Sequence, residues 1–222
     1  MMGHRGVRVG ITYPEIYEMQ IRAVFEALVE LTKKKVKAHP QIMIPQISSI
    51  AELNHIKKTY DIIKKETEKK YKMKLKINFG TMIEVVRAAL TAEELASTAE
   101  FFSFGTNDLT QGTFSFSRED VEGKFLPEYM EKELLERNPF QSIDVTGVGS
   151  LIKMGIAAGR GVRPNMEVGI CGEHGGDPSS IKFCHGEGLT YVSASPHRIP
   201  IAIVAAAQAA IEQPKKVRKS RK

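Results

Sequence analysis

The fold is indicated most clearly by one stretch of the sequence, Ala99-Glu100-Phe101-Phe102-Ser103-Phe104-Gly105-Thr106-Asn107-Asp108. It begins with a short, mostly apolar run that is typical of a buried strand, and polar residues follow directly. Similar short runs alternate along the chain with longer stretches whose apolar residues recur at helical spacing. This alternation predicts an α/β fold.

Five strands are expected, and the helices between them have recognisable start signals. Ser49 with Glu52 has the spacing of a capping box, and so does Thr91 with Glu94. Asp177 before Pro178 is typical of a helix N-cap and first position. The expected strands are residues 41–45, 75–83, 99–104, 167–170 and 190–193. The expected helices begin at Pro14, after Ser49, after Thr91, around Val148, at Pro178 and at Pro200.

One connection does not fit a simple alternation of strands and helices. Residues 111–145 are polar and aromatic, and glycine and proline interrupt them. The segment is long for a plain connection. We therefore expect an excursion or lid at this place.

Length and composition restrict the class of protein. A chain of 222 residues suits one sizeable domain, and 42% hydrophobic with 26% charged residues excludes wholesale disorder and a fibrous repeat. No apolar run approaches the roughly 20 residues of a membrane span, and the start lacks the apolar core of a signal peptide. We expect a cytoplasmic protein without a membrane partner.

The net charge of +6 is concentrated at the C-terminal end. Six lysine and arginine residues follow Pro214 without any acid, so the rest of the chain is formally neutral. A basic end of this kind is most often solvated, and we expect no nucleic-acid partner. The predicted organisation is a domain over residues 1–213 and a basic tail over residues 214–222.

Two acids stand at the ends of expected strands. In parallel α/β barrels the chemistry lies where strands end and helices begin, and Glu84 and Asp108 occupy such positions. Two carboxylates converging there could hold Mg²⁺ together with water and an oxygen-rich substrate. Alternatively, each acid is only a helix cap or a first-turn acid. Their shared position favours the metal site.

Cys171 follows the next strand in a glycine-rich loop, where a thiol could donate or accept a proton. An inert buried thiol is the alternative. A zinc site made of Cys171, His174, Cys184 and His185 is a weak hypothesis, because adjacent residues point in different directions along a helix. With only two cysteines in the chain, no disulfide framework is expected.

The chain start holds a further candidate. Arg5 lies between His4 and Gly6, and its guanidinium could bind an anionic substrate, although a frayed terminus is an equal alternative. Gly147-x-Gly149 is not a dinucleotide fingerprint, because Ile152 replaces the third glycine. No P-loop motif occurs either, so the sequence shows no place for ATP chemistry.

These residues belong to longer motifs that resemble a known family, the C-terminal phosphoenolpyruvate/pyruvate-binding domain of pyruvate, phosphate dikinases. The resemblance covers nearly everything before the tail. Enzyme I of the sugar phosphotransferase system and phosphoenolpyruvate synthase share part of it. The motifs are Gly3-His4-Arg5-Gly6, Thr12-Tyr13-Pro14-Glu15, Gly80-Thr81-Met82-Ile83-Glu84, Gly105-Thr106-Asn107-Asp108-Leu109-Thr110-Gln111 and Cys171-Gly172-Glu173-His174-Gly175-Gly176-Asp177.

The resemblance implies a role for each candidate. Glu84 and Asp108 would bind Mg²⁺ and substrate, and Cys171 would be the catalytic proton donor. The other implied substrate-binding residues are Arg5, Gly105, Thr106 and Asn107. The implied reaction is a phosphotransfer between a phosphohistidine and pyruvate, which forms phosphoenolpyruvate.

The resemblance also implies that the chain is a fragment. It would supply about the last five strand-helix units of a (β/α)8 TIM-type barrel, without the ATP-grasp domain and the phosphohistidine domain that would be its partners. An incomplete barrel exposes strand edges, and a homodimer is one association that would cover them. Two functions stay open at this point: a catalytic part of a dikinase, or a catalytically incomplete remnant or interaction module.

Overall fold

The computed structural model describes residues 1–212, so the predicted tail at residues 214–222 lies outside the described residues. The described chain forms two compact units. The first comprises Met1–Ser103 and Met154–Glu167, and the second comprises Phe104–Lys153 and the chain from Val168 onward.

The strands confirm the α/β class. The sheet has the strand order β1-β2-β3-β4-β5, and helices separate the strands along the chain. The pairs β1/β2 and β4/β5 are parallel, with Gln41 opposite Asn78 and Gly169 opposite Tyr191. This is the arrangement of a partial (β/α)8 barrel. The strands are β1 (Gln41–Ile44), β2 (Asn78–Ile83), β3 (Phe101–Gly105), β4 (Glu167–Cys171) and β5 (Tyr191–Val192).

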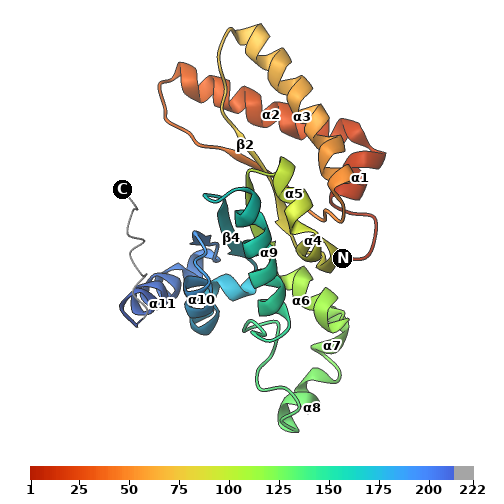
Figure 1. The fold of residues 1–222 in the computed structure, drawn as a ribbon, viewed down its shortest axis with the longest axis vertical. Coiled ribbons are helices and arrows are strands. Elements are labelled where there is room, and N and C mark those ends of the chain that lie inside the picture. Colours follow the sequence, from red (N-terminus) through yellow and green to blue (C-terminus); the bar gives the residue numbers. More distant parts are fainter. Residues whose placement is uncertain (213–222) are drawn as a thin grey trace. The chain divides into compact units, whose positions relative to one another are not determined.

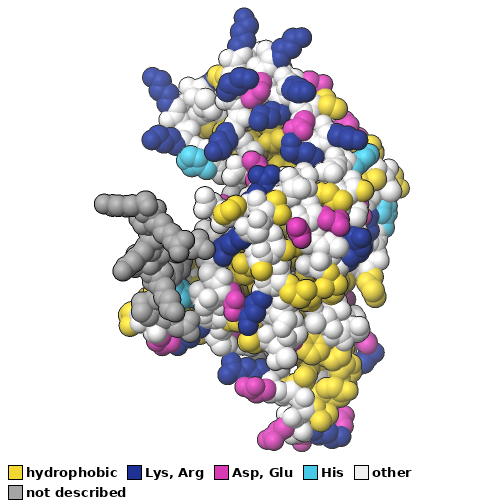
Figure 2. Space-filling model, viewed as in Figure 1, with side chains coloured by type: hydrophobic (Ala, Val, Ile, Leu, Met, Phe, Trp, Pro, Cys, Tyr) yellow, Lys and Arg dark blue, Asp and Glu magenta, His cyan; other side chains and the backbone are white. Residues whose placement is uncertain are grey.

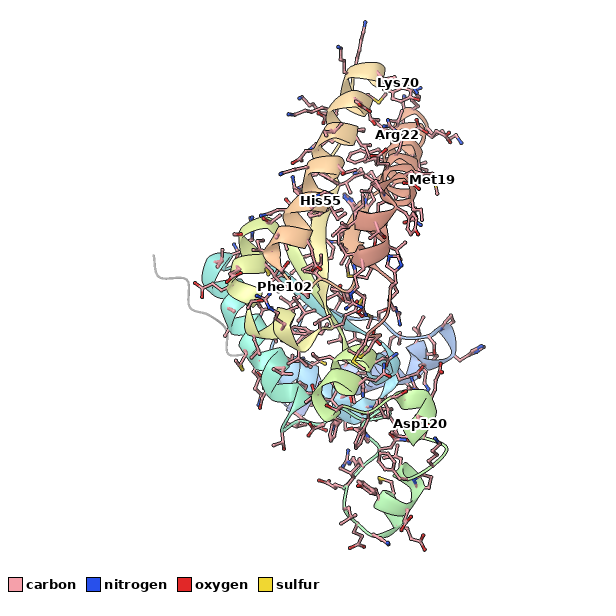
Figure 3. All side chains as sticks on the ribbon, turned by 90° about the vertical axis from the view of Figure 1, so that its right-hand side faces the viewer. Met19, Arg22, His55, Lys70, Phe102 and Asp120 are labelled. Atoms are coloured by element: carbon pink, nitrogen blue, oxygen red, sulfur yellow. The ribbon has the colours of Figure 1, made fainter. Side chains whose placement is uncertain are left out.

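In the first unit two long helices lie side by side, α2 (Pro14–Lys33) and α3 (Ile50–Tyr71) (Figure 1). The buried rings of Phe25, Tyr60 and Phe79 join these helices to β2, with centroids 5.3 Å and 5.1 Å apart. Met19 and Arg22 project from α2 and Lys70 from the end of α3 (Figure 3). The unit also contains α1 (Val7–Thr12), α4 (Val86–Leu90), α5 (Ala92–Thr98) and the end of α9 (Val148–Val162).

The surface of α2 and α3 far from the strands is strongly basic. Figure 2 shows lysine and arginine side chains gathered over the free ends of these two helices. Two ion pairs between the helices, Arg22 with Glu66 at 2.8 Å and Lys70 with Glu26 at 3.7 Å, lie on exposed side chains. Such exposed pairs contribute little to stability, so the apolar contacts hold the helices together.

The second unit contains the predicted excursion, which is ordered around a small core of its own. Val121, Leu126 and Phe140 are buried there, and Phe116 and Phe125 pack against them.

No helix of the described residues is long and apolar enough to cross a membrane. The helices of this unit are α6 (Thr106–Phe114), α7 (Arg118–Val121), α8 (Leu126–Glu131), the start of α9, η1 (Glu173–Gly176), α10 (Pro178–Gly186), η2 (Pro196–Arg198) and α11 (Ile199–Glu212).

Two local predictions were wrong, and hydrogen bonds explain both. The expected strand from residue 75 begins only at Asn78, because Leu75 donates its N–H to Glu68 and Ile77 accepts from the Tyr60 hydroxyl. The expected Thr91 cap is absent. Its hydroxyl donates to the carbonyl of Arg87 at 2.9 Å, because α4, which was not predicted, runs directly into this position.

Candidate functional site

The Cys171 loop begins where β4 ends. Cys171 is half-buried, and its Sγ lies 3.7 Å from the carbonyl oxygen of Phe104. Gly172 has φ +106°, and an added Cβ would lie 2.8 Å from Oδ1 of Asn107. Glycine is therefore required at this turn, because a side chain would be both strained and obstructed. The turn brings the Cys171 loop against the start of α6.

The start of α6 contains four predicted site residues, Gly105 to Asp108. Thr106 is buried and donates its hydroxyl to the carbonyl of Cys171 at 2.9 Å. Oδ1 of Asn107 accepts from the N–H of Glu173 at 3.1 Å, and Oδ1 of Asp108 accepts from Nε2 of Gln111 at 3.1 Å. The second unit thus brings Thr106 and Asn107 together with Cys171. Asp108 is also a first-turn acid of α6, which was the alternative explanation for its position.

The first unit holds Glu84 and Arg5. Glu84 follows β2, is only 6% exposed, and accepts the N–H of Gln46 on Oε1 at 2.7 Å. Burial, and then the charge of Glu84, raise the pKa of Tyr17. Glu84 is not a side-chain cap of α4, so the cap alternative was wrong for this acid.

The N-terminal segment is anchored beside Glu84, through contacts with Pro45 and Gln46. Val7 donates its N–H to the carbonyl of Pro45, and a Cβ on Gly6 would lie 2.7 Å from the side chain of Gln46, the residue that binds Glu84. Nε2 of His4 also lies 2.6 Å from Oγ1 of Thr12. These contacts argue against a frayed terminus and leave the exposed Arg5 beside an anchored turn.

The zinc hypothesis was wrong. Both ring nitrogens of His174 are engaged elsewhere, with Oγ1 of Thr106 at 2.7 Å and the carbonyl of Pro139 at 2.9 Å. Cys184 is buried, and burial raises the pKa of its thiol to about 12. Among residues 1–212, no three His, Cys, Asp or Glu side chains are grouped so that they could hold a metal ion.

Asp177 is a polar centre whose role as helix cap was predicted but whose full network was not. Its Oδ2 accepts from the N–H and hydroxyl of Ser180 and from the hydroxyls of Ser142 and Ser179, at 2.6–2.8 Å. It therefore caps α10 and ties this helix to the segment around Ser142. Burial alone would raise the pKa of Asp177, but these hydrogen bonds outweigh it and hold the pKa below its ordinary value.

We expect Asp177→Asn to destabilise the protein by about 2 kcal/mol at pH 7, because an amide replaces a charged acceptor of four hydrogen bonds. A carboxyl with a depressed pKa stabilises the fold above its unfolded pKa and loses that effect as the pH falls through its folded pKa. The difference between wild type and variant should therefore shrink below about pH 4. Urea unfolding across this range measures it. Asp120→Asn, on an exposed acid, is the control and should change stability little.

From the sequence, the buried His174 was considered only as a zinc ligand. It is completely buried, and burial lowers its pKa against the opposing effects of the Pro139 carbonyl, Asp177 and Glu173. The available sequence signal was the position of His174, a polar residue in a glycine-rich loop directly after a strand. Its partners, Thr106 and Pro139, are 68 and 35 residues away in the chain, so no local pattern reveals them.

Comparison with known proteins identifies the family. Residues 1–211 match the family described as PEP-utilising enzyme, PEP-binding domain. The chain is 55% identical to pyruvate, phosphate dikinase of Entamoeba histolytica over 97% of its own length and 24% of that protein. Identity to pyruvate, phosphate dikinase of Clostridium symbiosum is 52%, over 95% of this chain and 24% of that protein. The chain thus spans about a quarter of the length of the curated relatives it matches.

A solved structure supports the fold. A citrate lyase from Burkholderia xenovorans superimposes with a TM-score of 0.56 at 18% identity, over 85% of this chain and 53% of that one. At this identity the likeness concerns the fold alone. The strand order of the sheet, the polar residues at the strand ends and the family match over residues 1–211 all indicate the same fold. The chain belongs to the PEP-binding domain family of PEP-utilising enzymes.

Proposed function

We propose that this chain is the C-terminal part of a pyruvate, phosphate dikinase, a phosphotransferase. In the complete enzyme it would bind pyruvate, which receives a phosphoryl group from a phosphohistidine on another domain and becomes phosphoenolpyruvate. The observation that carries this proposal is the packing of the Cys171 loop against Thr106 and Asn107 at the start of α6. A phosphohistidine domain and an ATP-grasp domain are the proposed partners. A cytoplasmic location stays a prediction, since the Arabidopsis thaliana relative is named chloroplastic.

The proposed metal ligands are Glu84 and Asp108. Their chemistry fits Mg²⁺, which is commonly held by one or two carboxylates together with substrate oxygens and water. One oxygen of each carboxylate accepts a hydrogen bond, from the N–H of Gln46 and from the amide of Gln111, and these bonds orient the two side chains. When bound, Mg²⁺ would supply positive charge that stabilises the developing negative charge of the substrate.

The remaining site residues bind the substrate and move one proton. Backbone N–H groups at the start of α6, around Gly105 to Asn107, favour an anionic group, and Arg5 would add a guanidinium. In the proposed step, Cys171 takes a proton from the pyruvate methyl group. The enolate oxygen then forms a bond to phosphorus while the P–N bond of the phosphohistidine breaks. In the reverse direction Cys171 donates the proton to the methylene carbon.

The alternative is a module that binds the ligand but does not turn over. The observation in its favour is the length of the chain, which spans only about a quarter of its dikinase relatives. On either account we propose one partial barrel domain over residues 1–213 and a separate basic tail over residues 214–222.

Exchange of pyruvate methyl protons with D₂O separates the two functions. We expect the methyl NMR signal to decay in the presence of the chain and Mg²⁺, and the decay to stop in Cys171→Ala. Cys184→Ala is the matched control and should keep the activity, because Cys184 is buried within α10. Absence of exchange with the folded wild type, together with retained ligand binding, would establish the binding module instead.

A further inference from the structure

His174 connects three parts of the second unit although none of its atoms is exposed. Nε2 lies 2.9 Å from the carbonyl of Pro139, and Nδ1 lies 2.7 Å from Oγ1 of Thr106. The same Oγ1 lies 2.9 Å from the carbonyl of Cys171. A continuous path of polar contacts thus runs from Pro139, at the end of the excursion, to the Cys171 loop.

The protons available for this path can be counted. The two ends, the carbonyls of Pro139 and Cys171, only accept hydrogen bonds. Three hydrogen bonds therefore need three protons between the imidazole and the hydroxyl of Thr106. A neutral imidazole and one hydroxyl supply two, and only an imidazolium supplies the third.

The surroundings oppose the third proton. Burial is the largest effect on His174 and lowers its pKa, and Arg118 acts in the same direction. The Pro139 carbonyl, Asp177 and Glu173 oppose this effect without overcoming it. The ring is therefore neutral at pH 7, and the hydroxyl of Thr106 must choose between Nδ1 of His174 and the carbonyl of Cys171.

We propose that His174 is a positioning residue for Cys171, and that it acts by competing for the single hydroxyl proton of Thr106. With Nδ1 protonated, the hydroxyl of Thr106 turns to the Cys171 carbonyl and fixes the turn at Gly172. With Nε2 protonated, the hydroxyl turns to the ring and releases that carbonyl, while the bond to Pro139 forms. The position of the excursion is thereby linked to the Cys171 loop. A catalytic role for this linkage rests on the proposed function, whereas the linkage itself does not.

Isosteric variants of His174 separate the contributions of its two ring nitrogens, Nδ1 and Nε2. His174→Asn places an amide near the position of Nδ1, and His174→Gln places one near the position of Nε2. We expect Asn to preserve the link to Thr106 and Gln to preserve the link to Pro139 only. Thr106→Val removes the hydroxyl without changing the shape of the side chain much. Thr113→Val, on a residue of the same helix whose hydroxyl binds Leu109, is the matched control.

Two measurements on the full chain test the proposal without any substrate. In ¹⁵N-histidine NMR, Thr106→Val should shift the Nδ1 resonance of His174, and Thr113→Val should not. Iodoacetamide should modify Cys171 on the order of fivefold faster in Thr106→Val, because the loop opens more often without its tether. In His174→Gln no group at the Nδ1 position competes for the Thr106 hydroxyl, so Cys171 should be modified more slowly than in the wild type. His174→Asn should stay near the wild-type rate, and the buried Cys184 should stay unmodified throughout.

The outcomes are distinct. A Cys171 modification rate in folded His174→Gln that equals or exceeds the wild-type rate would show that the ring does not compete for the Thr106 hydroxyl, and the proposal would be wrong. An unmoved Nδ1 resonance in folded Thr106→Val would also overturn it. Because neither measurement needs Mg²⁺ or pyruvate, failure here is distinguishable from failure of the proposed function.

Discussion

Glu84→Gln and Asp108→Asn are each expected to weaken Mn²⁺ binding on the order of 100-fold, about 2.7 kcal/mol. Each substitution keeps the size of the side chain and removes the negative charge that a divalent cation requires. Glu84 is the more informative position, because Oε1 accepts from the N–H of Gln46 and the amide oxygen of Gln can keep this bond. The variant should therefore fold while its metal affinity falls. Titration of Mn²⁺ followed by electron paramagnetic resonance measures free and bound metal directly.

Matched acids show whether the effect belongs to these two positions. Glu93 and Asp120 are exposed acids in the first turns of α5 and α7. Glu93→Gln and Asp120→Asn remove the same charge and should leave Mn²⁺ affinity within about twofold, since screened surface charges act weakly. Wild-type affinity in folded Glu84→Gln or Asp108→Asn would contradict the assignment of the metal ligands.

Gly175→Ala is expected to destabilise the protein by at least about 4 kcal/mol, or to prevent folding. An added Cβ would overlap the backbone carbonyl oxygen of Ser193. A shift of the Ser193 backbone would be unfavourable, because its N–H donates to the carbonyl of Ile170 in β4 at 2.9 Å. The glycine therefore permits close contact between η1 and the chain after β5. Urea unfolding followed by circular dichroism measures the loss.

A second glycine provides the contrast. Gly161 lies inside α9, and an added Cβ there would meet no atom within 4 Å. Gly161→Ala should be neutral or stabilise by up to about 1 kcal/mol, because alanine is the better helix former. If Gly175→Ala unfolded at the same urea concentration as Gly161→Ala, close packing at η1 would not be a determinant of stability.

Much of the fold could be predicted because its signals are local. Pro14 begins α2, and the capping box of Ser49 and Glu52 begins α3, with both reciprocal hydrogen bonds present. Asp177 caps α10. In each case the physical cause lies within four residues of the element that it starts, so a single sequence contains it.

The parts that could not be predicted depend on distant partners. The segment from Leu75 to Ile77 is apolar enough for a strand, yet it binds Glu68 and Tyr60 of α3. No local pattern shows that these bonds replace strand pairing. His174 is a similar case, since its partners become visible only when the chain is folded.

The candidate site could be predicted in part. Glu84, Asp108 and Cys171 could be placed from the sequence because each stands at or just after the end of a predicted strand, and the structure confirms these positions. The predicted substrate-binding role of Arg5 followed from the resemblance more than from the residues next to it in the sequence. Hydrogen bonds such as that between Thr106 and the Cys171 carbonyl needed the structure, because they join residues 65 positions apart.

We propose that this chain forms a Mg²⁺-dependent site for an enolpyruvate-like anion. Calorimetric titration of the chain with oxalate, a mimic of the pyruvate enolate, with and without Mg²⁺, tests it most directly. We predict binding that requires Mg²⁺ and is lost in Glu84→Ala and Asp108→Ala. Oxalate binding of equal strength without the metal, or none by a chain that unfolds cooperatively, would contradict the account.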